Sequence, residues 1–177
     1  SIYQAKDIVI DTSWLDTLPF EHKINGMAEV IKMGLIKGGR LYDLVKNSDP
    51  TCWKHFDDII RLSANYKLEI IEDDFRDIKG CRELLNLGHT WGHGYELSQD
   101  ILHGFAVADG IIEEMKYTNY YYGFPSLSVL KKILNLLKKW KLIDDKKNLS
   151  FNKFDKNYGT KFLYFYMSKD KKENRLV

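Results

Sequence analysis

The sequence has few of the features that mark several common classes of protein. It has only three prolines among 177 residues, no low-complexity linker and no internal repeat, so we expect residues 1–177 to form one domain. Its two cysteines, Cys52 and Cys81, lack the spacing of a metal motif. They are therefore expected to be free thiols in a reducing compartment.

Long apolar runs and a strong charge imbalance are also lacking. No run reaches the roughly 18–20 apolar residues of a membrane span, and the first residues have no signal-peptide pattern. The net charge is only +2, and basic residues alternate with acidic ones, so nucleic acid is not an expected partner. A glycine-rich strand–turn–helix fingerprint for a dinucleotide is missing as well. We expect a cytoplasmic protein that binds neither membrane nor nucleic acid.

Hydrophobic residues make up 44% of the sequence and recur mostly at helical spacing. The β-branched run Ile8-Val9-Ile10 predicts a short strand, while residues 161–167 fit either a strand or a buried helix. The charged segment 73–80 is expected to be an exposed loop. The predicted fold is therefore mainly α with a few short β-strands, and the predicted helices cover residues 24–37, 41–46, 53–71, 82–96, 106–120 and 127–140.

The most informative segment runs from Arg82 to Glu96. In a helix, His89 and His93 would lie one turn apart on a polar stripe that Arg82 and Asn86 continue. This segment also contains three glycines, each of which costs about 0.5–1 kcal/mol relative to alanine inside a helix. Such a cost indicates a close approach to the helix backbone, for which a metal or a ligand is a candidate. Histidines four apart also occur on ordinary surfaces and in cores.

A third histidine and a carboxylate extend this set. His103 opens a run of small residues suited to the start of a close-packed helix, and Glu29 lies in an upstream predicted helix. Two or three imidazoles with one carboxylate suit a zinc ion that keeps a position open for substrate. Glu29 and Lys32, taken alone, are also consistent with a surface ion pair.

Six segments, residues 1–4, 11–19, 26–32, 85–93, 103–104 and 170–172, occur in an order that resembles the C-terminal domain of 3-dehydroquinate synthase, in the sugar phosphate cyclase superfamily. The resemblance implies that Glu29, His89 and His103 are the zinc ligands. The loop before the family's arginine differs here, because it carries Asp74 and Asp77 and one extra residue. The resemblance further implies catalytic roles for His93, Lys32, Lys67 and Asp77, and substrate contacts for Arg82, Asn86 and Lys171 or Lys172.

The resemblance implies a carbon–oxygen lyase of the shikimate pathway, which leads to chorismate and the aromatic amino acids. The family converts 3-deoxy-D-arabino-heptulosonate 7-phosphate to 3-dehydroquinate and phosphate, with zinc (or another divalent metal such as cobalt) and transiently reduced NAD. An N-terminal NAD-binding domain is expected to precede Ser1, so the chain alone should be inactive and the complete enzyme a homodimer. Two alternatives remain open: a related cyclase of the 2-deoxy-scyllo-inosose or valiolone type, and a non-catalytic metal-binding helical module.

Overall fold

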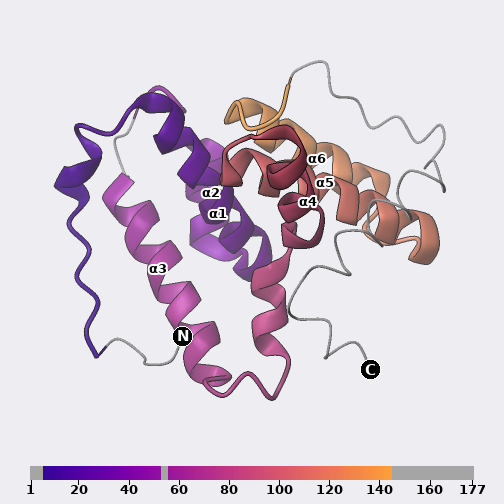
Figure 1. The fold of residues 1–177 in the computed structure, drawn as a ribbon, viewed down its shortest axis with the longest axis horizontal. Helices are drawn as coiled ribbons and strands as arrows, with labels where there is room; N and C mark the ends of the chain where they lie inside the picture. Colours follow the sequence, from indigo (N-terminus) through magenta and orange to yellow (C-terminus); the bar gives the residue numbers. More distant parts are fainter. Residues whose placement is uncertain (1–5, 53–55, 145–177) are drawn as a thin grey trace.

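The protein is a packed assembly of helices (Figure 1). The computed structural model describes residues 6–52 and 56–144. Within these ranges there is no strand, and the prediction of a mainly helical fold is confirmed. The elements are the 3₁₀ helices η1 (Thr12–Leu15) and η2 (Cys81–Asn86) and the α-helices α1 (Phe20–Lys37), α2 (Gly39–Asn47), α3 (Phe56–Asp73), α4 (His89–Gln99), α5 (His103–Tyr122) and α6 (Leu127–Lys139).

Helix α1 lies at the centre and packs against α2, α3 and α5. Its apolar residues Ile24, Met27 and Ile31 are spaced by three and four positions, so they share one face, and each is at most 2% exposed. Full burial of such a side chain stabilises the fold by about 1.5–3 kcal/mol. The helix begins at Phe20, earlier than predicted. Pro19 precedes it as N-cap with φ −54°, where the missing N–H of proline costs nothing.

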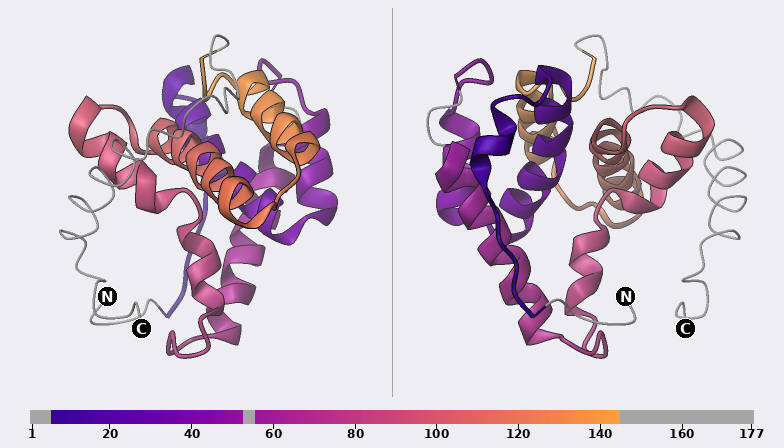
Figure 2. Two further views of the ribbon diagram at one scale, coloured as in Figure 1. Left: turned by 90° about the vertical axis from the view of Figure 1, so that its right-hand side faces the viewer. Right: turned by 60° about the vertical axis from the view of Figure 1, so that its left-hand side comes forward.

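Helix α6 packs against α5 (Figure 2). Leu130 and Leu137 are fully buried, whereas Lys131 and Lys132 are exposed, as the periodicity predicts. Its last turn is tied to α2 because Nε1 of the buried Trp140 donates a hydrogen bond to the carbonyl of Val45 at 3.1 Å. The segments predicted at residues 161–167 and 170–172 lie outside the described residues.

The strand predicted for Ile8-Val9-Ile10 does not form. Val9 is 92% exposed, and its two neighbours are more than half exposed. A strand requires a partner for its backbone hydrogen bonds, and the described part of the chain contains no other strand. High β-propensity alone therefore does not make this segment a strand.

The end of α3, the following loop and η2 project away from the other helices, at the bottom of Figures 1 and 2. The loop was expected to be exposed throughout, but Asp74 is only 3% exposed. Its Oδ1 accepts hydrogen bonds from the N–H groups of Ile78 and Lys79 at 2.8 and 3.1 Å. Burial acts to raise the pKa of Asp74, but the backbone donors outweigh it and the pKa lies below 3.8. Asp74 therefore organises the loop from inside.

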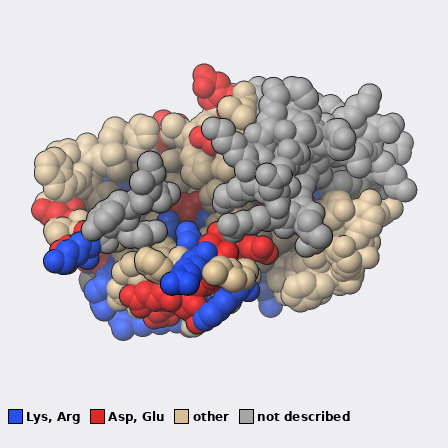
Figure 3. Space-filling view, turned by 60° about the horizontal axis from the view of Figure 1, so that its bottom comes forward, with Lys and Arg blue, Asp and Glu red and all other residues tan. Residues whose placement is uncertain are grey.

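Charges of both signs mingle on the face of the molecule that this loop occupies (Figure 3). Basic and acidic side chains lie next to one another there, and the described residues form no purely basic patch on that face. Separately, none of the helices in residues 6–52 and 56–144 is long and apolar enough to cross a bilayer.

Candidate metal centre

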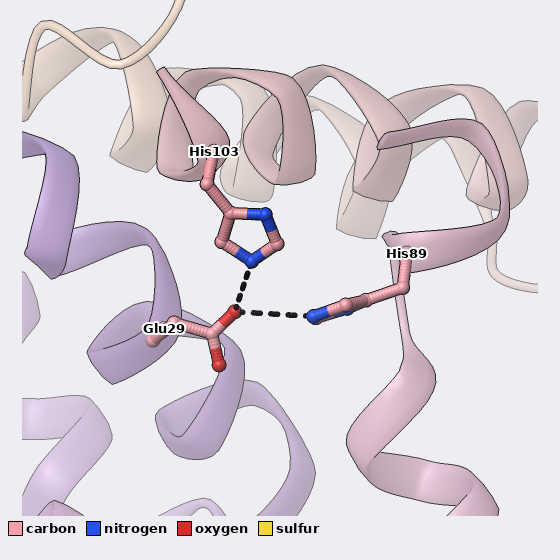
Figure 4. A group of neighbouring side chains, drawn as sticks. All are labelled: Glu29, His89 and His103. Carbon is pink, nitrogen blue, oxygen red and sulfur yellow. Dashed lines mark ion pairs between the residues drawn. The ribbon is translucent and has the colours of Figure 1, made fainter. Parts of the chain in front are cut away.

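Three helices bring Glu29, His89 and His103 to one point (Figure 4). Glu29 lies in the middle of α1, and the two histidines are the first residues of α4 and α5. Oε1 of Glu29 is 3.5 Å from Nε2 of His89 and 3.7 Å from Nε2 of His103. One ligand atom from each residue lies within 4.8 Å of the others. Their convergence matches the set expected from the sequence.

The distances from Oε1 of Glu29 to the two Nε2 atoms are close to those between ligands of a tetrahedral metal site. With zinc–ligand bonds of about 2.0–2.2 Å, two ligands of a tetrahedral site are about 3.3–3.6 Å apart. Oε1 of Glu29 is moreover buried and has no hydrogen-bond partner among the described residues. An unpaired buried carboxylate oxygen is costly, and a cation between the three side chains would remove that cost. The residues present therefore fit a divalent metal.

The other nitrogen of each imidazole is held by an acceptor. Nδ1 of His89 is 3.3 Å from the carbonyl of Leu87, and Nδ1 of His103 is 3.1 Å from Oε2 of Glu96. Because a carbonyl and a carboxylate only accept, both neutral rings carry their proton on Nδ1. The lone pairs of both Nε2 atoms then face Glu29. Metal-binding histidines are typically fixed in this way.

Lys32 links Glu29 to η2 through two contacts of its ammonium group. Its Nζ donates to Oε2 of Glu29 and to the carbonyl of Leu85, both at 2.7 Å, and its side chain is 3% exposed. The alternative of a surface ion pair is therefore wrong. Burial is the main cause that lowers the pKa of Lys32, and the charge of Lys67 lowers it further. Burial acts to raise the pKa of Glu29, but the hydrogen bond and charge of Lys32 bring it below 4.5.

His89 has a perturbed pKa as well. Burial is the largest cause that lowers it from 6.5, and the charge of Lys32 acts in the same direction. The neutral form of His89, which is the form that binds a metal, is therefore favoured near pH 7.

Two glycines of the histidine segment, Gly88 and Gly92, allow close packing against α5. A Cβ on Gly110 of α5 would overlap the carbonyl of Gly88, and a Cβ on Gly88 would lie 2.6 Å from Cγ1 of Ile111. Gly88 also has φ +80°, a value that residues with a side chain rarely adopt. The close approach expected from the sequence is real, but the neighbour is α5 rather than a metal or a ligand.

Arg82, Asn86, His89 and His93 do not form one helical stripe, so that prediction is wrong. Arg82 and Asn86 belong to η2, and the chain leaves the helical conformation at Leu87, with ψ 124°, before α4 begins. In a 3₁₀ helix residues three apart eclipse, so residues four apart point about a third of a turn away from each other. Within η2, Arg82 is half-buried and Asn86 is exposed.

The structure places the remaining predicted residues in different parts of the chain. His93 is exposed, and its ring centroid lies 5.5 Å from that of His89 and 6.2 Å from that of His103. Lys67 is exposed on α3, close enough to act on the pKa of Lys32. Asp77 is half-buried in the projecting loop with φ +55°. Lys171 and Lys172 lie outside the described residues.

The sequence did not single out two carboxylates that touch this centre. Glu96 lies seven positions after His89, two turns along the same helix face, and that spacing was the available signal. Glu114 of α5 accepts a hydrogen bond from the N–H of Gly88 at 2.8 Å. Burial raises its pKa, although the N–H groups of Gly88, Thr90 and Trp91 act against the shift. No local sequence pattern predicts a contact between residues 88 and 114.

Comparisons with known proteins show what this chain is similar to. A family model described as "3-dehydroquinate synthase C-terminal" matches residues 26–173. The 3-dehydroquinate synthase of Pyrococcus furiosus is 39% identical over 134 residues, which are 74% of this chain and 39% of that protein. The enzyme of the same name from Sulfolobus acidocaldarius is 33% identical over 181 residues, 97% of this chain and 49% of that protein.

A further relative, the 3-dehydroquinate synthase of Saccharolobus solfataricus, is 38% identical over 143 residues, 77% of this chain and 40% of that protein. The chain thus spans between 39% and 49% of the length of these three curated relatives.

Proposed function

Because this chain belongs to the 3-dehydroquinate synthase family and matches its C-terminal part, we propose that it is the metal- and substrate-binding part of such an enzyme. The proposed reaction converts 3-deoxy-D-arabino-heptulosonate 7-phosphate to 3-dehydroquinate and phosphate, in the shikimate pathway to chorismate and the aromatic amino acids. The convergence of Glu29, His89 and His103 from three helices supports this proposal most strongly.

In this proposal Glu29, His89 and His103 hold a zinc ion or another divalent metal such as cobalt. A bound divalent cation supplies Lewis-acid polarisation of a substrate oxygen. Two nitrogens and one oxygen leave a fourth position open, which distinguishes a catalytic zinc site from a closed structural one. Lys32 neutralises the second oxygen of Glu29, at 2.7 Å, so that the carboxylate keeps one orientation.

The proposed substrate carries a carboxylate and a phosphate, and the cationic residues that the family resemblance assigns to it suit both. Arg82 presents a planar fork that can bind either anion through two hydrogen bonds, whereas Lys67 and Lys32 act as point charges. We assign Asn86 and either Lys171 or Lys172 to further substrate contacts. Asp77, in the loop that Asp74 organises, is assigned a catalytic role by the family resemblance.

His93 is proposed to exchange a proton with the substrate or to hold its phosphate. It lies one turn after His89 on α4 and faces the same group of rings, but it is not one of the three residues whose ligand atoms converge. An exposed imidazole beside the centre can take and return a proton near neutral pH.

The redox part of the reaction needs a nicotinamide. We propose that NAD is held mainly by a separate N-terminal nucleotide-binding domain of the same enzyme, and that the complete enzyme is a homodimer. Hydride transfer depends on holding the nicotinamide against the substrate. Residues 1–177 alone are therefore expected to bind a divalent metal without turning over the sugar phosphate.

A phosphate-release assay tests this function. The enzyme that joins this chain to its nucleotide-binding domain should release phosphate from the substrate with NAD and zinc, and 3-dehydroquinate should be the product. Chelation should abolish the activity and added zinc should restore it. A different carbocyclic product would favour a related cyclase, and metal binding without any turnover would favour a non-catalytic module.

A further inference from the structure

The histidines His89 and His103 share an unusual position in the fold. Each is the first residue of its helix, directly after the N-cap residues Gly88 and Leu102. Neither N-cap supplies a side-chain hydrogen bond to its helix. The first N–H groups of a helix have no partner within the helix, so they bond to water or to other parts of the molecule.

In both helices a side chain from a different helix does so. Oδ1 of Asn25 on α1 accepts a hydrogen bond from the N–H of Gly104, the second residue of α5, at 2.7 Å. Glu114 on α5 accepts one from the N–H of Gly88, the N-cap of α4, at 2.8 Å. A carboxylate oxygen suits this position, because the N-terminus of a helix carries a partial positive charge.

These two contacts link the three helices in a definite order. Asn25 precedes Glu29 by four residues, so the amide that holds α5 and the carboxylate at the centre lie one turn apart on α1. Helix α5 in turn holds α4 through Glu114. Replacing Gly104 would disturb the first contact, because a Cβ there would overlap the backbone carbonyl of Asn25.

We propose that Asn25 and Glu114 are positioning residues of the metal centre, each fixing the start of the helix whose first residue is His103 or His89. This inference rests on the proposed metal site and adds two residues that make no contact with the metal themselves. A displacement of either helix start would move an Nε2 atom away from Oε1 of Glu29. Side chains that orient ligands typically change metal affinity by about 10–100-fold when replaced.

The test measures the zinc affinity of the purified protein by competition with a chelator. Asn25→Ala removes one acceptor, and Glu114→Met removes the other while preserving most of the volume. We expect each to weaken zinc binding by about 10–100-fold. Asn25→Asp and Glu114→Gln keep an oxygen acceptor and should retain most of the affinity. The visible spectrum of bound Co²⁺, which reports coordination geometry, should change in the first two variants only.

Two control variants separate positioning from general stability. Asn119→Ala removes the hydrogen bond from Nδ2 to the carbonyl of Pro125, 2.7 Å long, at the far end of α5. Glu113→Ala removes the ion pair with Lys116, 2.9 Å long, next to Glu114. Both should lower the melting temperature of the metal-free protein and leave the zinc affinity unchanged.

The possible outcomes distinguish this inference from the proposed function. If the wild-type protein binds zinc and both Asn25→Ala and Glu114→Met bind it equally well, the positioning role is wrong while the metal site stands. If the wild-type protein binds no divalent metal, both are wrong. Because Asn25 and Glu114 lie on different helices, a variant that does not fold at one site leaves the other to decide.

Discussion

Oε2 of Glu96 lies 3.1 Å from Nδ1 of His103, on the side of the imidazole opposite Glu29. Glu96 therefore holds the ring at Nδ1, while Nε2 faces Oε1 of Glu29 across the proposed metal position. Glu96 comes from α4 and Glu29 from α1, so the orientation of His103 depends on three helices at once.

Replacing Glu96 should weaken metal binding without unfolding the protein. Glu96→Ala leaves Nδ1 of His103 without its acceptor, and outer carboxylates of this kind contribute about 10–100-fold to metal affinity. Glu96→Gln retains an oxygen acceptor, so its zinc affinity should lie between that of Glu96→Ala and that of the wild type. Zinc titration checks the order of the three affinities, and an Ala variant that binds as tightly as the wild type would contradict it.

His93 is expected to act on the substrate and not on the metal. His93→Ala in the complete enzyme should lower turnover by about 10²–10⁴-fold, the usual contribution of a general acid or base. Its zinc content should stay near one ion per chain, because the three ligand residues are intact. Metal analysis beside steady-state kinetics checks both. Loss of the zinc would make His93 a ligand.

Two glycine-to-alanine changes should have opposite effects on stability. Gly110→Ala forces a Cβ against the carbonyl of Gly88, and overpacking of this kind costs about 1–3 kcal/mol. Gly26→Ala meets nothing within 4 Å in α1, so it should stabilise the protein by about 0.5–1 kcal/mol through helix propensity. Urea unfolding measures both. Equal effects of the two changes would mean that α4 and α5 are not closely packed there.

The sequence predicted the helical fold and named the residues that converge, but not how they are held. Periodicity identified α1 and α6 because their apolar stripes face a single core. The residue types alone indicated two or three imidazoles with one carboxylate, and the resemblance to the family supplied the particular set of Glu29, His89 and His103. The predicted helix 82–96 is interrupted at Leu87 and Gly88. Gly88 has a positive φ and lies directly against α5, a contact between distant residues that local periodicity does not predict.

Long-range contacts are the part that the sequence could not provide. Glu114 meets Gly88 and Asn25 meets Gly104 across large separations in the chain. The short β-branched run at Ile8 shows the converse, since its propensity is that of a strand but no partner strand exists in residues 6–52 and 56–144. Local sequence patterns predict helices and strands, whereas contacts between distant residues determine where a helix is interrupted, how it is capped and whether a strand finds a partner.

Asp74 should make stability depend on acid pH. Its pKa in the folded protein lies below 3.8 because backbone N–H groups bind the charged form. A depressed pKa contributes stability that is fully present above the unfolded value and is lost as the pH falls through the folded value. Asp74→Asn should therefore be less stable than wild type at pH 7, and the difference should shrink as the pH falls below 3.8.

Urea unfolding at several pH values measures this dependence. The exposed neighbour Asp73 provides the control, since its side chain is 64% exposed and contacts only Lys79 among the ion pairs of the described residues. Asp73→Asn should change stability little at any pH. If the difference between wild type and Asp74→Asn were independent of pH, Asp74 would not organise the loop through its charge.

The binding of a divalent metal by Glu29, His89 and His103 is tested most directly by anomalous diffraction from crystals grown with zinc. One peak should lie about 2.0–2.2 Å from Nε2 of both histidines and from a carboxylate oxygen of Glu29, and it should vanish in His103→Ala. A zinc peak elsewhere in the protein, or none at these three side chains, would contradict the proposed centre.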